Sequence, residues 1–348
     1  MAPWQAYHIG RKPLVRFDFL WYLSTHGPMD TWAHGAMRPR THGGMGPLHG
    51  GEKPMAKERK GIVIGVGNQK GGVGKTTNTV HIAAALGELR YKVLVIDADP
   101  QAGATKHLGV PIKSFAGTFE LVTRPDPDIA ALVIEDGMPK NVHMIPSRTE
   151  LSELESYVSK FTDTKDLFTR PLEQARTLYD FIFIDTPPSA RFPTTVSTYV
   201  AADWFLLSAF PHALAIYGLN EALADIADVR AQRNPNLEVL GVVITHVDGR
   251  TKGWREVDAL IKENLPTRAF DTLISRAEVF VKATERGKTI FQIPQFRAHK
   301  VVEQYRQLTK EIEWRVMNRE EFLSGGQLTL PTSDAANVDE SLPLAAHE

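Results

Sequence analysis

Apolar residues follow two different patterns along most of the chain. Short, mostly apolar runs of strand length occupy residues 62–66, 92–96, 181–184, 204–207 and 237–245, and residues 272–274 end a sixth. Apolar residues recur at helical spacing in residues 76–90, 213–232, 253–264 and 300–317. The first pattern predicts strands and the second predicts helices. Because the two alternate, we expect an α/β fold: a doubly wound, mostly parallel sheet flanked by helices.

The two ends of the chain lack both patterns. Residues 1–57 contain three tryptophans, five histidines and many Gly and Pro residues, and the histidine spacings match no metal-ligand pattern. We expect an irregular, disordered extension here; a start of translation at Met55 is the alternative. Residues 321–348 are polar and acidic and are also expected to be disordered. Residues 58–320 remain as the folded domain.

The composition excludes several kinds of chemistry. The 348 residues include no cysteine, so disulfides, thiol nucleophiles and cysteine-ligated metal or iron–sulfur sites are excluded. The net charge is -1, so nucleic acid or an anionic membrane could be bound only through a local basic patch. Every apolar run is shorter than the roughly 20 residues that span a bilayer. A cytoplasmic protein is therefore expected.

The stretch most informative about chemistry lies between the first predicted strand and the first predicted helix. Residues 67–77 read GNQKGGVGKTT, a glycine-rich loop whose N–H groups can surround phosphates at the positive end of a helix dipole. The expected phosphate-binding residues are Lys70, Gly71, Gly72, Val73, Gly74, Lys75, Thr76 and Thr77. Lys75 is expected to reach the β- and γ-phosphates, and Thr76 to bind Mg²⁺. The general P-loop pattern requires glycine where this chain has Gln69, whereas KGGxGKTT fits at every position.

Carboxylates follow two of the predicted strands. Asp97 and Asp99 come after the second strand in the segment DADPQ, and Asp185 follows the FIFI run in the segment DTPPS. Considered alone, the first pair is better explained as an Asp- and Pro-rich turn. However, ligands bind at the carboxyl ends of strands in open α/β sheets. We therefore expect these side chains beside the loop, with Asp185 holding Mg²⁺ through a water molecule.

Together these segments resemble the ParA/MinD ATPases over roughly residues 60–317. KGGVGKTT resembles the deviant Walker A box of that family, VLVIDADPQAGAT the box after the first helix, and DTPPS the switch segment. The resemblance implies a P-loop NTPase fold that binds ATP and Mg²⁺ and forms a homodimer when ATP is bound. It implies catalytic roles for Lys70, which would reach the partner's nucleotide, for Lys75, and for Asp99, which would position the attacking water. Thr76 and Asp185 would hold the metal, with Asp97 supporting it nearby.

Members of this superfamily differ in what they act on. The missing cysteines exclude the nitrogenase-type reductases and iron–sulfur carriers, and no basic amphipathic C-terminal helix of the MinD kind is found, so we expect no membrane binding. What remains resembles ParA proteins. The resemblance implies ATP-dependent DNA partitioning, in which the dimer binds non-specific DNA at the nucleoid and a ParB-like centromere-binding protein stimulates hydrolysis. It places DNA contacts at Arg250, Lys252, Arg276, Lys282, Arg286 and Lys288.

Alternatives remain open for these basic residues and for the function. The excess of basic over acidic residues in this region is modest, so a solvated mixed-charge surface is the alternative to a DNA-binding one. A ParA-like positioning ATPase for a protein cargo, such as a flagellar, chemotaxis or carboxysome complex, would share the same core. A small-molecule ligase of the dethiobiotin-synthetase type fits less well, because those relatives lack the early lysine that is Lys70 here.

Overall fold

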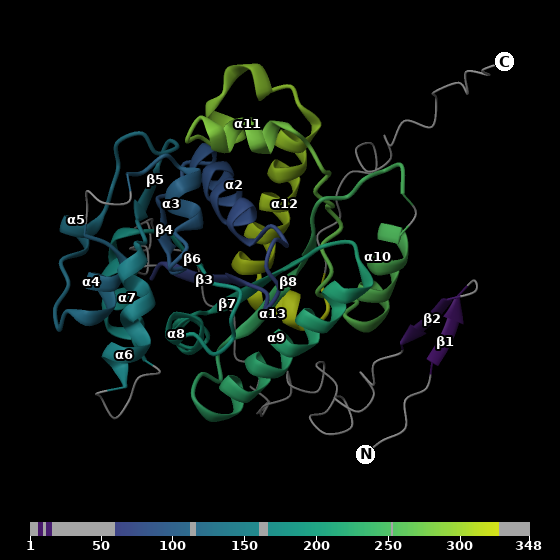
Figure 1. Cartoon of the computed structure of the whole chain (residues 1–348), viewed down its shortest axis with the longest axis horizontal. Helices are drawn as coiled ribbons and strands as arrows, with labels where there is room; N and C mark the ends of the chain where they lie inside the picture. Colours follow the sequence, from purple (N-terminus) through teal and green to yellow (C-terminus); the bar gives the residue numbers. More distant parts are fainter. Residues whose placement is uncertain are drawn as a thin grey trace, which may run out of the picture.

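A central sheet of six parallel strands organises the protein (Figure 1). The computed structural model describes residues 6–9, 12–15, 60–111, 116–159, 166–251 and 253–326. The strands are β3 (Ile62–Gly67), β4 (Val93–Asp97), β5 (Val142–Ile145), β6 (Phe181–Asp185), β7 (Trp204–Ala209) and β8 (Glu238–Ile244). They lie in the order β5-β4-β6-β3-β7-β8, and every pairing is parallel. The expected doubly wound α/β fold is confirmed.

The two edges of this sheet differ from the prediction. A strand ending at residues 272–274 is wrong, because the chain there runs beside β8 without forming a continuous ladder. It makes isolated bridges from Ala269 to Val242 and from Ser275 to Val247, just after β8, and Ile274 donates its N–H to Ile244 at 2.9 Å. The sixth strand is instead β5, at the opposite edge. It is four residues long and carries the polar His143 within it, so it lacks a recognisable apolar run. The outer side of β5 forms an isolated antiparallel bridge between Met144 and Ile134.

Helices cover both faces of the sheet (Figure 1). One face carries α2 (Lys75–Glu88), α3 (Gly103–His107), α11 (Val279–Glu285) and α12 (Lys300–Met317). The other carries α7 (Thr169–Leu178), α8 (Pro193–Ala201), α9 (Ala213–Gln232) and α10 (Gly253–Asn264). Shorter elements complete the connections: α4 (Thr118–Thr123), α5 (Ile129–Leu132), η2 (Thr149–Glu153), α6 (Leu154–Val158), η3 (Ile290–Gln292), η4 (Pro294–Phe296) and α13 (Arg319–Leu323). The predicted helices at 213–232, 253–264 and 300–317 have these bounds.

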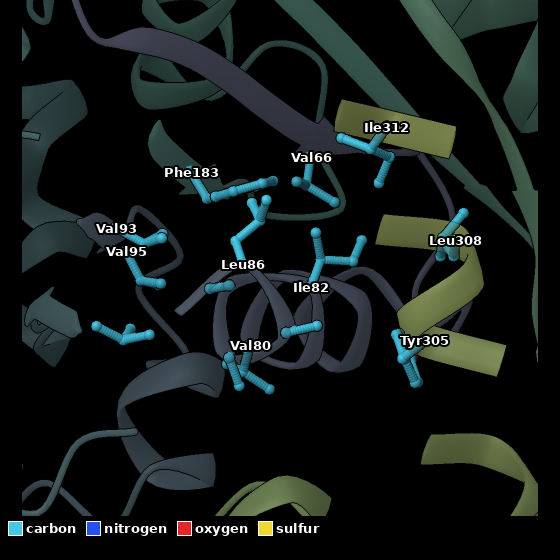
Figure 2. Close-up of a cluster of buried hydrophobic side chains, with 14 of the residues drawn as sticks. Val66, Val80, Ile82, Leu86, Val93, Val95, Phe183, Tyr305, Leu308 and Ile312 are labelled. Carbon is cyan, nitrogen blue, oxygen red and sulfur yellow. The ribbon is translucent and has the colours of Figure 1, made fainter. Parts of the chain in front are cut away.

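Helix α2 is buried on all sides because it lies between the sheet and the outer helices. Every residue from Asn78 to Gly87 is buried. Figure 2 shows Ile82 and Leu86 of this helix pointing toward Val66 and Phe183 of the sheet. Burying one such side chain contributes about 1.5–3 kcal/mol. The core therefore fixes the position of the first turn of α2, where the glycine-rich loop ends.

The carboxyl ends of β4, β6 and β3 lie side by side. In the sheet register Asp97 of β4 is paired with Asp185 of β6, and Asp185 is paired with Val66 of β3. From β3 the chain passes first to β4 on one side and later, through β6, to β7 on the other. Strand order thus reverses at β3, and such a reversal is where open α/β sheets bind their ligands.

Two short strands in the N-terminal extension, β1 (Ala6–Ile9) and β2 (Lys12–Val15), form an antiparallel pair. The sequence patterns do not predict them. The disordered tail expected from residue 321 begins later, because α13 extends to Leu323 and Phe322 is buried. The expected disorder of the rest of the extension and of residues 327–348 concerns positions outside the described residues and stays a prediction. No helix in the described part of the chain is both long and apolar enough to cross a membrane.

Candidate active site

The loop between β3 and α2 has the backbone of a phosphate cradle. Gly72 and Gly74 have φ angles of 75° and 85°, in the left-handed region that glycine adopts without strain. A Cβ on Gly74 would lie 2.9 Å from Thr245 Oγ1, and that hydroxyl donates a hydrogen bond to the carbonyl of Val73 at 3.0 Å. The loop is thereby fixed against the end of β8. Since Gly74 is also the N-cap of α2 and has no side chain to cap it, the first N–H groups of the helix remain available to an anion.

Lys75 folds back over this loop. Its Nζ donates a hydrogen bond to the carbonyl oxygen of Lys70 at 3.1 Å, and the residue is buried. Burial lowers the pKa of Lys75, and the negative charges of Asp185 and Asp99 oppose that shift. A partly desolvated cation at the rim of a ring of N–H groups is suited to a bound phosphate.

Thr76 and Asp185 form an oxygen pair suited to Mg²⁺. Thr76 Oγ1 donates to Asp185 Oδ2 at 2.7 Å, and Thr79 Oγ1 donates to Asp185 Oδ1 at 3.1 Å. Burial raises the pKa of Asp185 to about 7, and the charge of Asp97 adds to the shift. Mg²⁺ is usually held by one or two such oxygens together with phosphates and water. Among the described residues, no group of three or more His, Asp or Glu could hold a metal.

Asp97 and Asp99 have different surroundings. Asp97 Oδ2 accepts hydrogen bonds from N and Oγ1 of Thr105 at 2.8 and 2.7 Å, and Oδ1 accepts from N of Asp99 at 3.2 Å. Burial raises the pKa of Asp97 to about 6. Its carboxylate is thus committed to the turn that joins β4 to α3. Asp99 is half-buried and accepts the N–H of Gln101 at 2.8 Å.

Two residues to which the sequence patterns assigned no role hold the start of the loop. The side-chain amide of Asn68 donates to the carbonyl of Ser208 at 2.7 Å, and its Oδ1 accepts the N–H of Lys70 at 2.9 Å. Gln69 Nε2 donates to Asp225 Oδ2 of α9 at 2.7 Å. The glutamine that breaks the general P-loop pattern is therefore the sequence signal for this contact.

A cavity of about 420 Å³ opens next to His246. It is lined by Phe210, Pro211, His246, Asp248, Thr251 and Arg276. The rings of Phe210 and His246 lie 5.3 Å apart. Burial lowers the pKa of His246, and the charge of Arg276 adds to the effect. The cavity therefore combines flat, uncharged rings with a few polar groups, which suits a planar base.

Five of the six residues expected to contact DNA are described, and all five are exposed. They are Arg250, Arg276, Lys282, Arg286 and Lys288. Arg250 donates hydrogen bonds to both carboxylate oxygens of Asp248 at 3.0 and 2.7 Å, and Lys282 lies 3.2 Å from Glu278. Lys252 lies outside the described residues. The set divides between the cavity and the segment around α11.

Known proteins are similar to this chain in sequence and in fold. Residues 61–239 match a family described as an AAA domain. The chain is 33% identical over 259 residues to the chromosome-partitioning ATPase Soj of Thermus thermophilus, covering 73% of this chain and 96% of that protein. It is 32% identical over 238 residues to an uncharacterized protein of Mycobacterium tuberculosis, covering 68% and 74%. A crystal structure of cobyrinic acid a,c-diamide synthase from Mycobacterium smegmatis with bound ADP and magnesium has a TM-score of 0.64 and 26% identity, covering 74% of this chain and 96% of that one. The chain belongs to the ParA/MinD family of ATPases.

Proposed function

We propose that this protein is a DNA-partitioning ATPase whose two copies meet face to face when ATP and Mg²⁺ are bound. The observation that carries the proposal is Lys70. Asn68 and Lys75 bond to its main chain, whereas its ammonium makes no hydrogen bond or ion pair with any described residue. A cation positioned at the loop and without a partner among the described residues is available to the phosphates of a second subunit. Soj of Thermus thermophilus, similar over 96% of its length, supports the partitioning role.

Within one subunit, different residues would have different roles. The loop N–H groups and Lys75 would bind the phosphates, and the cavity beside His246 would receive the base. Bound Mg²⁺ would neutralise charge on the β- and γ-phosphate oxygens, held by Thr76 and Asp185. Asp99 is half-buried and would orient the attacking water, while Asp97 would keep the turn before α3 in place.

The exposed basic residues around α11 would bind the dimer to DNA. Lys282, Arg286 and Lys288 carry three positive charges within seven positions, and two subunits double that number. Contacts to phosphates depend on salt, since each one releases counterions. A ParB-like partner would then stimulate hydrolysis and release the protein from DNA.

A lysine comparison tests the proposal. Lys70→Ala is expected to bind ATP yet remain monomeric in light scattering with Mg²⁺ and a non-hydrolysable ATP analogue, whereas Lys75→Ala should lose nucleotide affinity. Lys310→Ala, which removes an exposed lysine from α12, is the matched control and should dimerise normally. DNA retention should require the analogue and fall as salt rises from about 50 to 200 mM.

Two results would count against this function. If Lys70→Ala dimerises at the same analogue concentrations as the wild type, the proposed role of Lys70 is refuted. Analogue-dependent dimers without DNA retention would instead support the positioning ATPase for a protein cargo.

A further inference from the structure

A buried histidine of α2, His81, has both ring nitrogens committed. It is 0% exposed. Its Nδ1 lies 2.8 Å from the carbonyl oxygen of Thr77, the last residue of the phosphate loop. A carbonyl oxygen only accepts, so Nδ1 carries the proton and donates it. Nε2 is then an acceptor, and the N–H of Ile290 donates to it at 3.3 Å. His81 thus joins the first turn of α2 to η3, across 209 positions of the sequence.

A second histidine, His107 of α3, extends this connection. The His81 and His107 rings meet edge to face with centroids 5.2 Å apart. Burial lowers the pKa of both rings, that of His107 to about 4, so both are neutral. Thr284 Oγ1 donates to the carbonyl of Phe280 at 2.9 Å and therefore accepts from His107 Nδ1, 3.2 Å away.

The same two segments also touch through their backbones. Gly109, just after α3, and Gly287, just after α11, have φ angles of 73° and 62°. A Cβ on Gly287 would lie 2.7 Å from the Cα of Gly109. Residues 284–290 are thus held at three points, by α2 through His81 and by the end of α3 through His107 and Gly109.

Both supporting helices begin at the nucleotide site. Helix α2 starts at Lys75, within the phosphate loop, and α3 contains Thr105, which binds the carboxylate of Asp97. The segment that they support contains or adjoins the exposed Lys282, Arg286 and Lys288. Figure 1 shows α11 above α2 and α12, at the outer surface of this face.

We propose that His81 is a positioning residue that couples nucleotide binding at the phosphate loop to the position of residues 279–292, and so regulates a surface for polyanions. The coupling rests on the proposed nucleotide binding but not on DNA as the partner. Phosphates that order the first turn of α2 fix the Thr77 carbonyl. His81 lies one turn further along the same helix, and the hydrogen bond from the N–H of Ile290 to its Nε2 then fixes Ile290, two residues beyond Lys288. By reciprocity, a polyanion on this surface raises nucleotide affinity by the same factor.

Two matched substitutions separate this role from simple core packing. In His81→Gln the amide oxygen is as many bonds from Cβ as Nε2 is and can still accept from Ile290. In His81→Asn the amide nitrogen takes the place of Nδ1, keeping the bond to Thr77 and losing the bond to Ile290. Both variants shrink the same buried ring, so a packing effect would be shared by both. Thr284→Val, at an exposed position, removes the hydroxyl that His107 binds and keeps the test valid if both His81 variants fold poorly.

The readout is hydrogen exchange of the amides of residues 279–292 in the full-length protein, with and without a non-hydrolysable ATP analogue and Mg²⁺. In the wild type the analogue should slow exchange about tenfold, within the range typical of coupled sites. His81→Gln should keep most of this effect, His81→Asn should lose it, and Thr284→Val should weaken it. Calorimetry on the same samples should show analogue affinities within about threefold of each other, since none of the substitutions replaces a residue of the phosphate loop.

Several outcomes would overturn the coupling. It is refuted if the analogue binds the wild type without changing exchange in 279–292, if the Asn and Gln variants respond alike, or, where neither folds, if Thr284→Val matches the wild type. A wild type that binds no nucleotide overturns both this inference and the proposed function. Exchange that responds to the analogue while DNA is not retained overturns only the partitioning role.

Discussion

The burial of Asp185 predicts how the stability of the ligand-free protein depends on pH. In the folded protein burial raises its pKa to about 7, against an ordinary value of 3.8. A carboxyl group that is protonated when folded and ionised when unfolded makes the protein less stable as pH rises between the two pKa values. Each pH unit in this window is worth about 1.4 kcal/mol. From pH 5 to pH 7 the loss from this group is therefore about 3 kcal/mol.

Asp185→Asn should remove that loss. The amide keeps the shape of the side chain, and the Thr76 and Thr79 hydroxyls that now donate to Asp185 can rotate to satisfy it. Without nucleotide and with EDTA present, the variant should be more stable than the wild type already at pH 5, because this pH lies above the ordinary pKa of 3.8. The difference should grow by about 3 kcal/mol between pH 5 and pH 8. ATP and Mg²⁺ should stabilise only the wild type, because the cation stabilises the ionised carboxylate of Asp185. The wild type should then be more stable than the variant.

Urea denaturation at pH 5 and pH 8 measures the effect. Asp126→Asn, at an exposed position after α4, is the control and should change stability equally at both pH values. The reasoning is refuted if the difference between Asp185→Asn and the wild type is the same at pH 5 and pH 8. In that case the site is hydrated well enough that burial does not shift the carboxylate.

Two further predictions concern the loop and the turn beside it. Gly74→Ala should destabilise the protein by about 2–3 kcal/mol and Gly72→Ala by about 1 kcal/mol; urea denaturation measures both. Both glycines have positive φ, but only at Gly74 does a Cβ meet another atom, Thr245 Oγ1 at 2.9 Å, so equal effects would contradict the packing argument. Thr105→Val should cost about 2 kcal/mol, because it removes a hydroxyl that donates to Asp97 and accepts a main-chain N–H at 2.9 Å. In the same denaturation assay an unchanged midpoint would show that this hydrogen bond is not needed.

The loop and the pair formed by Thr76 and Asp185 could be predicted because the sequence itself brings their residues together. Lys75 and Thr76 are contiguous with the glycines that shape the cradle, and the carboxylates sit where apolar strands end. Neighbouring parallel strands end at the same edge, so strand assignment alone placed Asp185 near Thr76. The structure puts these two 2.7 Å apart.

Pairings between distant segments could not be predicted in this way. Gln69 and Asp225 are 156 positions apart, and no periodicity indicates that α9 passes beside the loop. His81 lies among the apolar residues of a helix buried on all sides, so its polarity has no outward face to reveal it. Leu89, counted in the apolar pattern of the same helix, is 46% exposed, because α2 ends at Glu88 and the chain turns away.

The covered edges of the central sheet have a consequence for how the protein can associate. The chain around Ala269 and Ser275 lies along β8, and Ile134 bonds to the outer side of β5 through Met144. An uncovered edge is a template to which strands of further molecules can add without limit. The bridges at both edges hinder the addition of a further strand there, and the proposed face-to-face pair, related by a two-fold axis, would close on itself. Self-association would then stop at two copies, and nucleotide would control whether the pair exists and not how far a polymer grows.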